Sequence, residues 1–312
     1  MKTATLDNSR ISKHLGQTSE YKDQYDPGLL VSEPRSNNRK HLDITDDDLP
    51  FVGFDTWNAY EVSGLTNNGL PVAGVAKVVY PCDSKYIVES KSIKLYFNSF
   101  NMYKCGEQPL DVLDFIDKKA SEDLSSLLET VVHVHTTPAS FIANGDPVLS
   151  RYKYRTLEDT FTQEQLGDML LDTYSETPEL LWLEDVSEHG VVSEEVRWHS
   201  SLLKSNCRVT SQPDWGDVYI MYKAQTHVKP ESLLSYIVSF RDECHFHEEI
   251  CETIYKRLYD LLSPEELVVT CLYARRGGID INPVRASNNA LIARECQDLV
   301  DPFVMHTKTA KQ

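Results

Sequence analysis

The stretch that decides the fold is residues 246–273, FHEEICETIYKRLYDLLSPEELVVTCLY. Its first part, Phe246–Leu262, repeats apolar side chains at the spacing of an amphipathic helix. The run Leu267–Ala274 that follows is apolar almost throughout, which is typical of a buried strand. A helix followed by a buried strand predicts a mixed α+β fold.

The segments before this stretch extend the pattern. Val218–Ala224 alternates apolar and polar residues as a strand does, and Glu231–Phe240 has helical spacing. The same order of strand, helix, helix and strand is predicted earlier in the chain, over Gly69–Val88, a helix starting at Glu89–Ser90 with Ser90 as its N-cap, Pro109–Leu128 and Thr130–Thr136.

This repetition predicts two related α+β units. When Glu89 is aligned with Glu248, Leu95-Tyr96 falls on Ile254-Tyr255, which is a faint internal repeat. A length of 312 residues also suggests two units at ~150 residues each. We expect units at 1–143 and 197–312, separated by an acidic connector, 144–196, with little structure of its own.

Composition excludes several classes of protein. Acidic residues outnumber basic ones by 48 to 31, so the net charge is −17, which argues against a protein that coats nucleic acid. No apolar run approaches the ~20 residues of a membrane span. Residues 1–10 lack the apolar core of a secretory signal, and the seven cysteines show no disulfide pattern. We therefore expect a cytoplasmic chain with free thiols.

Nucleotide-binding signatures are also missing. The spacing Gly64–Gly69 resembles the opening of a phosphate loop, but Leu70-Pro71 stands where Lys-Ser/Thr is required. No G-x-G-x-x-G is present, so a Rossmann dinucleotide site is not expected.

A thiol and a carboxylate lie seven residues apart at Cys207 and Asp214. We expect Pro213 and Gly216 to form a turn that presents Asp214. A carboxylate near a thiol can accept its proton and return it later as a general acid. The alternative is a small buried Cys and a turn Asp without chemistry.

Three further segments hold polar residues suited to ligands. At a helix start, His247 could act as a general acid, and the Glu248 carboxylate could accept two parallel N–H bonds from a guanine-like edge. The alternative is an exposed acidic helix start. Arg275–Gly278, with two cations beside two glycines, and Lys91 with Lys94 on one helix face suit phosphate oxygens. The alternative in each case is an ordinary solvated surface, which is at least as consistent with the sequence.

Two His-x-His pairs, His133/His135 and His245/His247, raise the possibility of a metal site. A pair on one strand shares a face, which suits metal ions. We expect no metal, because no Cys or carboxylate stands at a recognisable ligand spacing.

Taken together, these segments resemble the nitrile reductases of queuosine biosynthesis, the NADPH-dependent 7-cyano-7-deazaguanine reductases, in their long two-unit form. The resemblance covers nearly all of the chain except residues 144–196. It is carried by Glu89–Phe97 and Asn98–Asn101, Leu203–Cys207, Gln212–Gly216, Val238–Arg241, Phe246–Glu248 and Arg275–Pro283.

The resemblance implies a tunnelling fold (T-fold), in which two tandem units each carry an antiparallel sheet with paired helices. It implies a homodimer, a metal-free site and reduction of a nitrile to an amine with two NADPH. Cys207 would form a covalent thioimide with Asp214 and His247 as catalytic partners. The substrate-binding residues would be Val88, Glu89, Ser90, His247 and Glu248, and the NADPH-binding residues Ser90, Lys91, Arg276 and Gly277.

Two other functions remain open on the sequence alone. A thiol-dependent nitrilase or amidase would use Cys207 and His247, need no NADPH and release ammonia. A purine-binding T-fold module would keep the pocket and use Cys207 only for packing.

Overall fold

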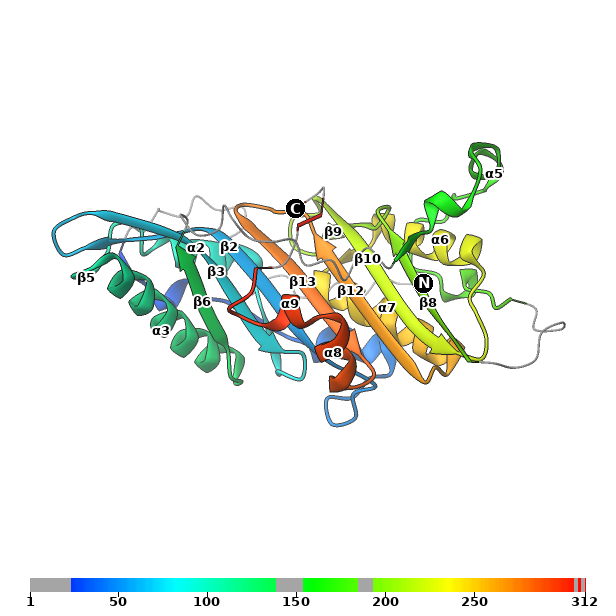
Figure 1. The fold of residues 1–312 in the computed structure, drawn as a ribbon, viewed down its shortest axis with the longest axis horizontal. Coiled ribbons are helices and arrows are strands. Elements are labelled where there is room, and N and C mark those ends of the chain that lie inside the picture. Colours follow the sequence, from blue (N-terminus) through cyan, green and yellow to red (C-terminus); the bar gives the residue numbers. More distant parts are fainter. Residues whose placement is uncertain (1–23, 139–153, 185–192, 306–307, 310–311) are drawn as a thin grey trace.

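The computed structural model describes residues 24–138, 154–184, 193–305, 308–309 and 312 (Figure 1). Residues 1–10, which bear on the expected absence of a secretory signal, lie outside this range. Within it, no helix is long and apolar enough to cross a membrane.

Among the described residues, an 11-stranded mixed sheet forms the centre of the molecule. Its main path runs in the order β11-β9-β10-β12-β13-β2-β3-β6, while β5 pairs with β2, β8 with β10 and β7 with β8. Its strands are β2 (Val52–Thr66), β3 (Pro71–Pro81), β5 (Lys104–Gly106), β6 (His133–Pro138), β7 (Arg155–Thr156), β8 (Glu194–Ser200), β9 (Lys204–Cys207), β10 (Pro213–Ala224), β11 (Cys244–His245), β12 (Glu266–Tyr273) and β13 (Ile279–Ala286).

The two halves of the chain share this sheet because β13 pairs with β2. The pairing is antiparallel and runs from Ile279 opposite Ala59 to Ala286 opposite Val52. Sequence analysis predicted a sheet in each unit and no strand at Ile279–Ala286. Hydrogen bonding instead joins the strands of both halves into one ladder, so a cavity can draw residues from either half.

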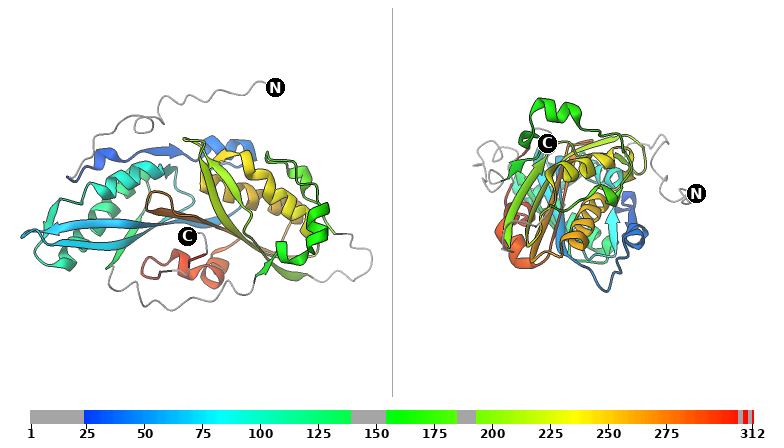
Figure 2. Two further views of the ribbon diagram at one scale, coloured as in Figure 1. Left: turned by 90° about the horizontal axis from the view of Figure 1, so that it is seen from above. Right: turned by 90° about the vertical axis from the view of Figure 1, so that its right-hand side faces the viewer.

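Helices cover both faces of the sheet (Figure 2). The predicted helices are α2 (Ser90–Asn98), α3 (Pro109–Leu128), α6 (Pro230–Ser239) and α7 (His247–Leu262). The pair α6/α7 lies on one side, and α8 (Asn289–Glu295) with α9 (Gln297–Val300) lies on the other, as the left view of Figure 2 shows. Shorter elements are η2 (Pro27–Leu29), β1 (Ser32–Pro34), α1 (Ser36–Arg39), η3 (Lys40–Leu42), β4 (Tyr86–Val88), η5 (Glu158–Thr160), α5 (Gln163–Asp168), η6 (Pro178–Leu180) and η7 (Phe240–Asp242).

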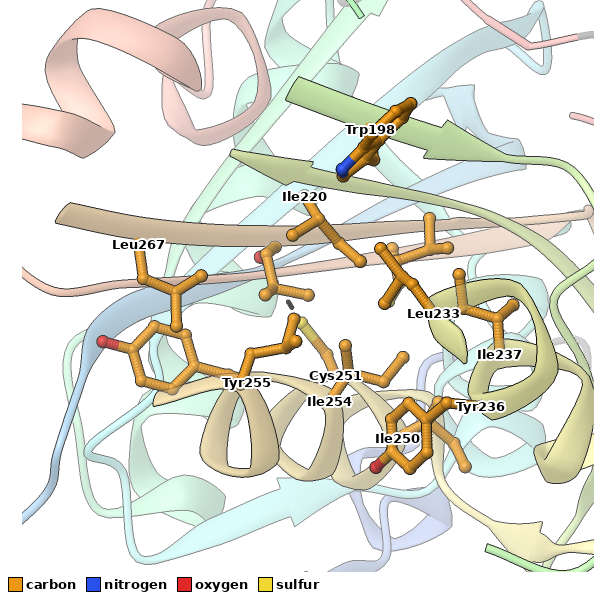
Figure 3. Close-up of a cluster of buried hydrophobic side chains, with 14 of the residues drawn as sticks. Trp198, Ile220, Leu233, Tyr236, Ile237, Ile250, Cys251, Ile254, Tyr255 and Leu267 are labelled. Carbon is orange, nitrogen blue, oxygen red and sulfur yellow. Dashed lines mark hydrogen bonds between the residues drawn. The ribbon is translucent and has the colours of Figure 1, made fainter. Parts of the chain in front are cut away.

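Apolar side chains of β10 point alternately to the two faces of the sheet, which explains why helices cover both faces. Ile220 and Tyr222 point to the core beneath α6 and α7, whereas Met221 between them packs under α8 and α9. Figure 3 shows Ile220 facing Ile254 of α7 across the first of these cores. Each fully buried aliphatic side chain of this kind contributes roughly 1.5–3 kcal/mol to folding.

The start of α2 differs from the prediction. Glu89, not Ser90, is the N-cap: its backbone is extended and its side chain accepts hydrogen bonds from Lys91 N and Ser92 N. Glu89 can do this because the N-cap side chain faces the free amides of the first turn. Ser90 is the first helical residue.

The segment expected as a connector, 144–196, has more structure than predicted where it is described. Leu157 and Leu181 are buried in the core of the C-terminal half. β8 (Glu194–Ser200) crosses the boundary expected at residue 196 and pairs with β10. Residues 144–153 and 185–192 of this segment lie outside the described residues.

Candidate active site

A cavity of about 240 Å³ opens where β9, β10 and the start of α7 meet the start of α2 and β13. It gathers residues from both halves of the chain. Its walls comprise Trp57, Glu89, Ser90, Lys91, Lys94, Cys207, Thr210, Asp214, His245, Phe246, His247, Glu248, Arg276, Gly277, Ile279 and Ile281. All of the predicted site residues line this cavity except Val88, which is buried in the N-terminal core at the end of β4.

Cys207 and Asp214 are brought together by a hairpin. Cys207 ends β9, and its N–H donates to Gln212 O at 2.8 Å, which closes the loop before β10. Ser211 in this loop has a left-handed φ of 54°. The predicted turn at Pro213 and Gly216 is therefore wrong: both residues lie in β10.

The strand assignment of these two residues has a physical reason. Pro213 is the first residue of β10, a place where a strand tolerates the missing N–H of proline. Gly216 allows close packing instead of a turn, because a Cβ there would lie 3.1 Å from the Tyr273 ring. The turn therefore forms before Pro213.

Asp214 is held by a histidine and an arginine, His247 and Arg276. Its side chain is only 4% exposed, His247 Nε2 lies 3.3 Å from Oδ2, and Arg276 Nη1 forms an ion pair with Oδ1. Burial alone would raise the pKa of Asp214, but the hydrogen bonds and charges of His247 and Arg276 hold it below its ordinary value. Asp214 is therefore held in its ionised, carboxylate form.

His247 is fixed by stacking. Its ring lies parallel to the Tyr273 ring, with centroids 3.7 Å apart and an interplanar angle of 7°. Its Nδ1 is buried and has no hydrogen-bond partner among the described residues. Because Nε2 faces Asp214, Nδ1 is the nitrogen left for a ligand or water.

Glu248 is a buried carboxyl in the cavity wall. It is 1% exposed, and its Oε1 has no hydrogen-bond partner within the described part of the chain. Burial, reinforced by the nearby Asp55 charge, raises the pKa of Glu248 to about 8. The prediction of an exposed acidic helix start does not hold, because the first turn of α7 is packed inside the molecule.

Three basic side chains, Lys91, Lys94 and Arg276, line another part of the cavity wall. Lys91 and Lys94 of α2 face the turn that carries Arg276 and Gly277. Gly277 has a left-handed φ of 57°, and a Cβ there would lie 3.0 Å from Lys94 Cδ. Cations beside a backbone that is bare of side chains match the needs of a phosphate-bearing ligand, so these residues fit NADPH.

His245 is a cavity residue that sequence analysis set aside. Its Nε2 lies 3.1 Å from Glu243 and its Nδ1 3.1 Å from Glu249, and these carboxylates raise its pKa to about 9 against the effect of burial. The sequence feature that could have identified His245 as a charged residue is the pair of glutamates near it, Glu243 two residues before and Glu249 four residues after. Four other residues of the cavity lining had no sequence feature that marks a site, because they look like ordinary strand or loop residues: Trp57, Thr210, Ile279 and Ile281.

The two His-x-His pairs do not converge. His245 ends β11 while His247 begins α7, and His135 on β6 lies 3.7 Å from Asp117. In the described ranges, no three His, Cys, Asp or Glu side chains are grouped as metal ligands.

Family models match segments in both halves of the chain. A family model described as "Nitrile reductase, 7-cyano-7-deazaguanine-reductase N-term" matches residues 21–136, and one described as "QueF-like protein" matches residues 213–291. A solved structure of the archaeosine synthase QueF-Like in the apo form covers 30% of this chain and 90% of its own at 20% identity, with a TM-score of only 0.26.

Curated relatives match over nearly their whole length. The NADPH-dependent 7-cyano-7-deazaguanine reductase of Legionella pneumophila (strain Lens) is 40% identical over 280 residues, which is 90% of this chain and 91% of the relative. The protein of the same name from Rickettsia felis is 39% identical over 277 residues, 88% of this chain and 93% of the relative. The chain therefore belongs to the family of NADPH-dependent 7-cyano-7-deazaguanine reductases.

Proposed function

We propose that this chain reduces the nitrile of 7-cyano-7-deazaguanine to the aminomethyl group, using NADPH, in queuosine biosynthesis. One observation carries the proposal: Cys207, Asp214, His247 and Glu248 share a single cavity with a basic wall. The names of the relatives support the same reaction.

Each side chain has a proposed task. Glu248 and Glu89 hold the N–H groups of the deazaguanine, with Ser90 beside it. Val88, buried next to Glu89 at the end of β4, supports this wall from behind. The Glu89 carboxylate lies in the cavity wall and accepts hydrogen bonds from Lys91 N at Oε1 and from Ser92 N at Oε2, which fix its orientation. Ser90, Lys91, Arg276 and Gly277 hold NADPH.

The chemistry begins at sulfur. Cys207 attacks the nitrile carbon and forms a thioimide, while Asp214 takes the thiol proton and His247 stands beside the reacting group. Bound by Ser90, Lys91, Arg276 and Gly277, NADPH would supply the two hydrides of the reduction, one before and one after Cys207 leaves. Asp214 would supply protons to the nitrogen. A free imine would hydrolyse in water, so the site has to keep water out between the two steps.

The wider setting is part of the proposal. We propose a T-fold built from tandem units at 1–143 and 197–312, a homodimer, and a cytoplasmic enzyme that meets the free base without contacting nucleic acid. The order of strand, helix, helix and strand in both halves supports the two units. The net charge of −17 supports the absence of a nucleic-acid contact.

Counting NADPH tests the proposal. Purified protein with 7-cyano-7-deazaguanine should oxidise two NADPH per nitrile consumed, followed by absorbance and by mass analysis of the product. Cys207→Ala should lose this activity and stay folded, while Cys244→Ala, which changes an exposed thiol outside the cavity lining, should keep it.

The outcome also separates the alternatives. Release of ammonia without NADPH oxidation would indicate a thiol hydrolase. Binding of the base with neither reaction would indicate a module without chemistry. Full turnover by Cys207→Ala would remove the covalent route.

A further inference from the structure

We propose that Arg276 is a positioning residue for the proton carrier: its guanidinium keeps the Asp214 carboxylate anionic beside Cys207 before NADPH binds. This inference rests on the proposed function. It gives Arg276 a task in forming the covalent adduct, in addition to the proposed contact with NADPH.

The two oxygens of Asp214 have different partners. Oδ1 accepts from Arg276 Nη1, and Oδ2 faces His247 Nε2 at 3.3 Å. Arg276 is 40% exposed, whereas the Asp214 side chain is 4% exposed, so the cation reaches from the rim of the cavity to a carboxylate inside it. Burial alone would lower the pKa of the Arg276 guanidinium, but its hydrogen bond to the Asp214 carboxylate and the charge of that carboxylate raise it. Arg276 and Cys207 line the same cavity.

The backbone holds Arg276 in this place. Arg276 N donates to Ile279 O at 2.9 Å, and Ile279 N donates to Arg276 O at 3.2 Å, which closes a tight turn between β12 and β13. Gly277 and Gly278 inside the turn have φ values of 57° and 77°, as a two-residue hairpin turn of type I′ requires. The turn fixes the Cα of Arg276 without help from a ligand.

The groups that face Asp214 leave Arg276 with a distinct role. They are His247 from α7, Tyr273 from β12, Cys207 from β9 and Arg276 from the β12–β13 turn. Burial keeps the Tyr273 phenol neutral by raising its pKa. Removing Arg276 would take away its hydrogen bond and positive charge while Asp214 stays buried, so the Asp214 carboxylate would bind a proton more readily.

The step that depends on this carboxylate needs no reductant. The bond from sulfur to the nitrile carbon forms and one π bond of C≡N breaks. The thiol proton passes to Asp214 and then to the nitrile nitrogen. No electrons enter or leave, so the mass of the adduct equals protein plus substrate, and its formation can be followed without NADPH.

The test is the rate of adduct formation against pH, followed by intact mass with 7-cyano-7-deazaguanine and no NADPH. In Arg276→Gln, the acidic limb of the profile should move up by about one pH unit, the size of one lost charge-assisted hydrogen bond. Arg276→Lys should restore most of this shift because it returns the charge. Arg275→Ala should match the unmodified chain, since Arg275 lies over the Tyr60 ring, 3.8 Å from its centroid.

Two results separate failure of this inference from failure of the proposed function. If Arg276→Gln forms the adduct with an unshifted profile, the inference is wrong and Arg276 serves NADPH alone. If the unmodified chain forms no adduct at any pH, the proposed function itself fails. Circular dichroism of each variant checks that the fold is retained.

Discussion

Glu252 and Arg285 form an ion pair inside the protein, with 2.9 Å between Glu252 Oε1 and Arg285 Nη2 and at most 3% of either side chain exposed. Glu252 also pairs with Arg39, and Arg285 with Asp55. The network therefore ties α7 and β13 of the C-terminal half to α1 and β2 of the N-terminal half. It lies one helical turn from Glu248, so it supports the wall of the cavity.

Breaking this network should cost much of the stability. Glu252→Ala leaves Arg39 and Arg285 buried without a shared partner, and such a loss typically costs about 3–5 kcal/mol. Urea denaturation of both proteins gives the difference in free energy of unfolding. Glu129→Ala removes an exposed partner of Lys85 and should leave that free energy unchanged. If Glu252→Ala lowers the free energy of unfolding no more than the Glu129→Ala control does, the network does not stabilise the fold.

The buried carboxyl of Glu248 predicts a pH-dependent stability. Its pKa of about 8 in the folded protein lies above the ordinary value, so between pH 5 and pH 8 the folded state holds a proton that the unfolded state has lost. Glu248 therefore lowers the free energy of unfolding as pH rises through this window, by up to about 1.4 kcal/mol per pH unit. Glu248→Gln removes this effect.

Denaturation of Glu248→Gln and of the unmodified chain at several pH values measures how the free energy of unfolding of each depends on pH. The stability gained by the variant should grow from pH 5 to pH 8 and then level off. Glu265→Gln, which changes an exposed partner of Lys223, serves as the control. A gain that stays constant over the whole range would mean that Glu248 is ionised in the folded protein.

The carboxylate of Asp214 should matter for the covalent step and much less for binding. In Asp214→Asn, adduct formation should slow by about 10²-fold or more, because an amide cannot accept the thiol proton. Affinity for the base should change little. Stopped reactions read by intact mass give the rate, and equilibrium dialysis gives the affinity.

A second Asp–His pair provides the matched control, because its aspartate, Asp217, lies on β10 like Asp214 while its histidine, His199, lies on β8. Asp217 lies 3.0 Å from His199 outside the cavity lining, so Asp217→Asn should form the adduct at the normal rate. Equal rates for Asp214→Asn and the unmodified chain would exclude Asp214 as the proton carrier.

Local patterns predicted the helices well. The range expected for α3, Pro109–Leu128, is the one observed, and α7 starts one residue later than predicted. Long amphipathic repeats predict such helices reliably, because one face of the helix must be buried against the sheet. β13 was missed although it forms a hairpin with the predicted strand β12. Its other partner, β2, is more than two hundred residues away in sequence, so no local pattern reports that pairing.

The sequence identified several site residues as candidates, but it did not predict which distant residues contact them. Spacing suggested Cys207 with Asp214, yet nothing local indicated that Arg276 reaches Asp214 from another hairpin. The burial of Glu248 was also hidden, since an acidic first turn usually faces solvent and this one is enclosed by neighbouring elements. Such contacts depend on tertiary packing, which no window of sequence contains.

The central claim is that the sulfur of Cys207 bonds to the carbon of a nitrile. The most direct measurement is intact-mass spectrometry of the protein with saturating 7-cyano-7-deazaguanine and no NADPH, followed by peptide mapping. The account predicts a species heavier by one substrate, with the added mass on Cys207 and none in Cys207→Ala. A spectrum with only the unmodified chain, or the added mass on another residue, would contradict it.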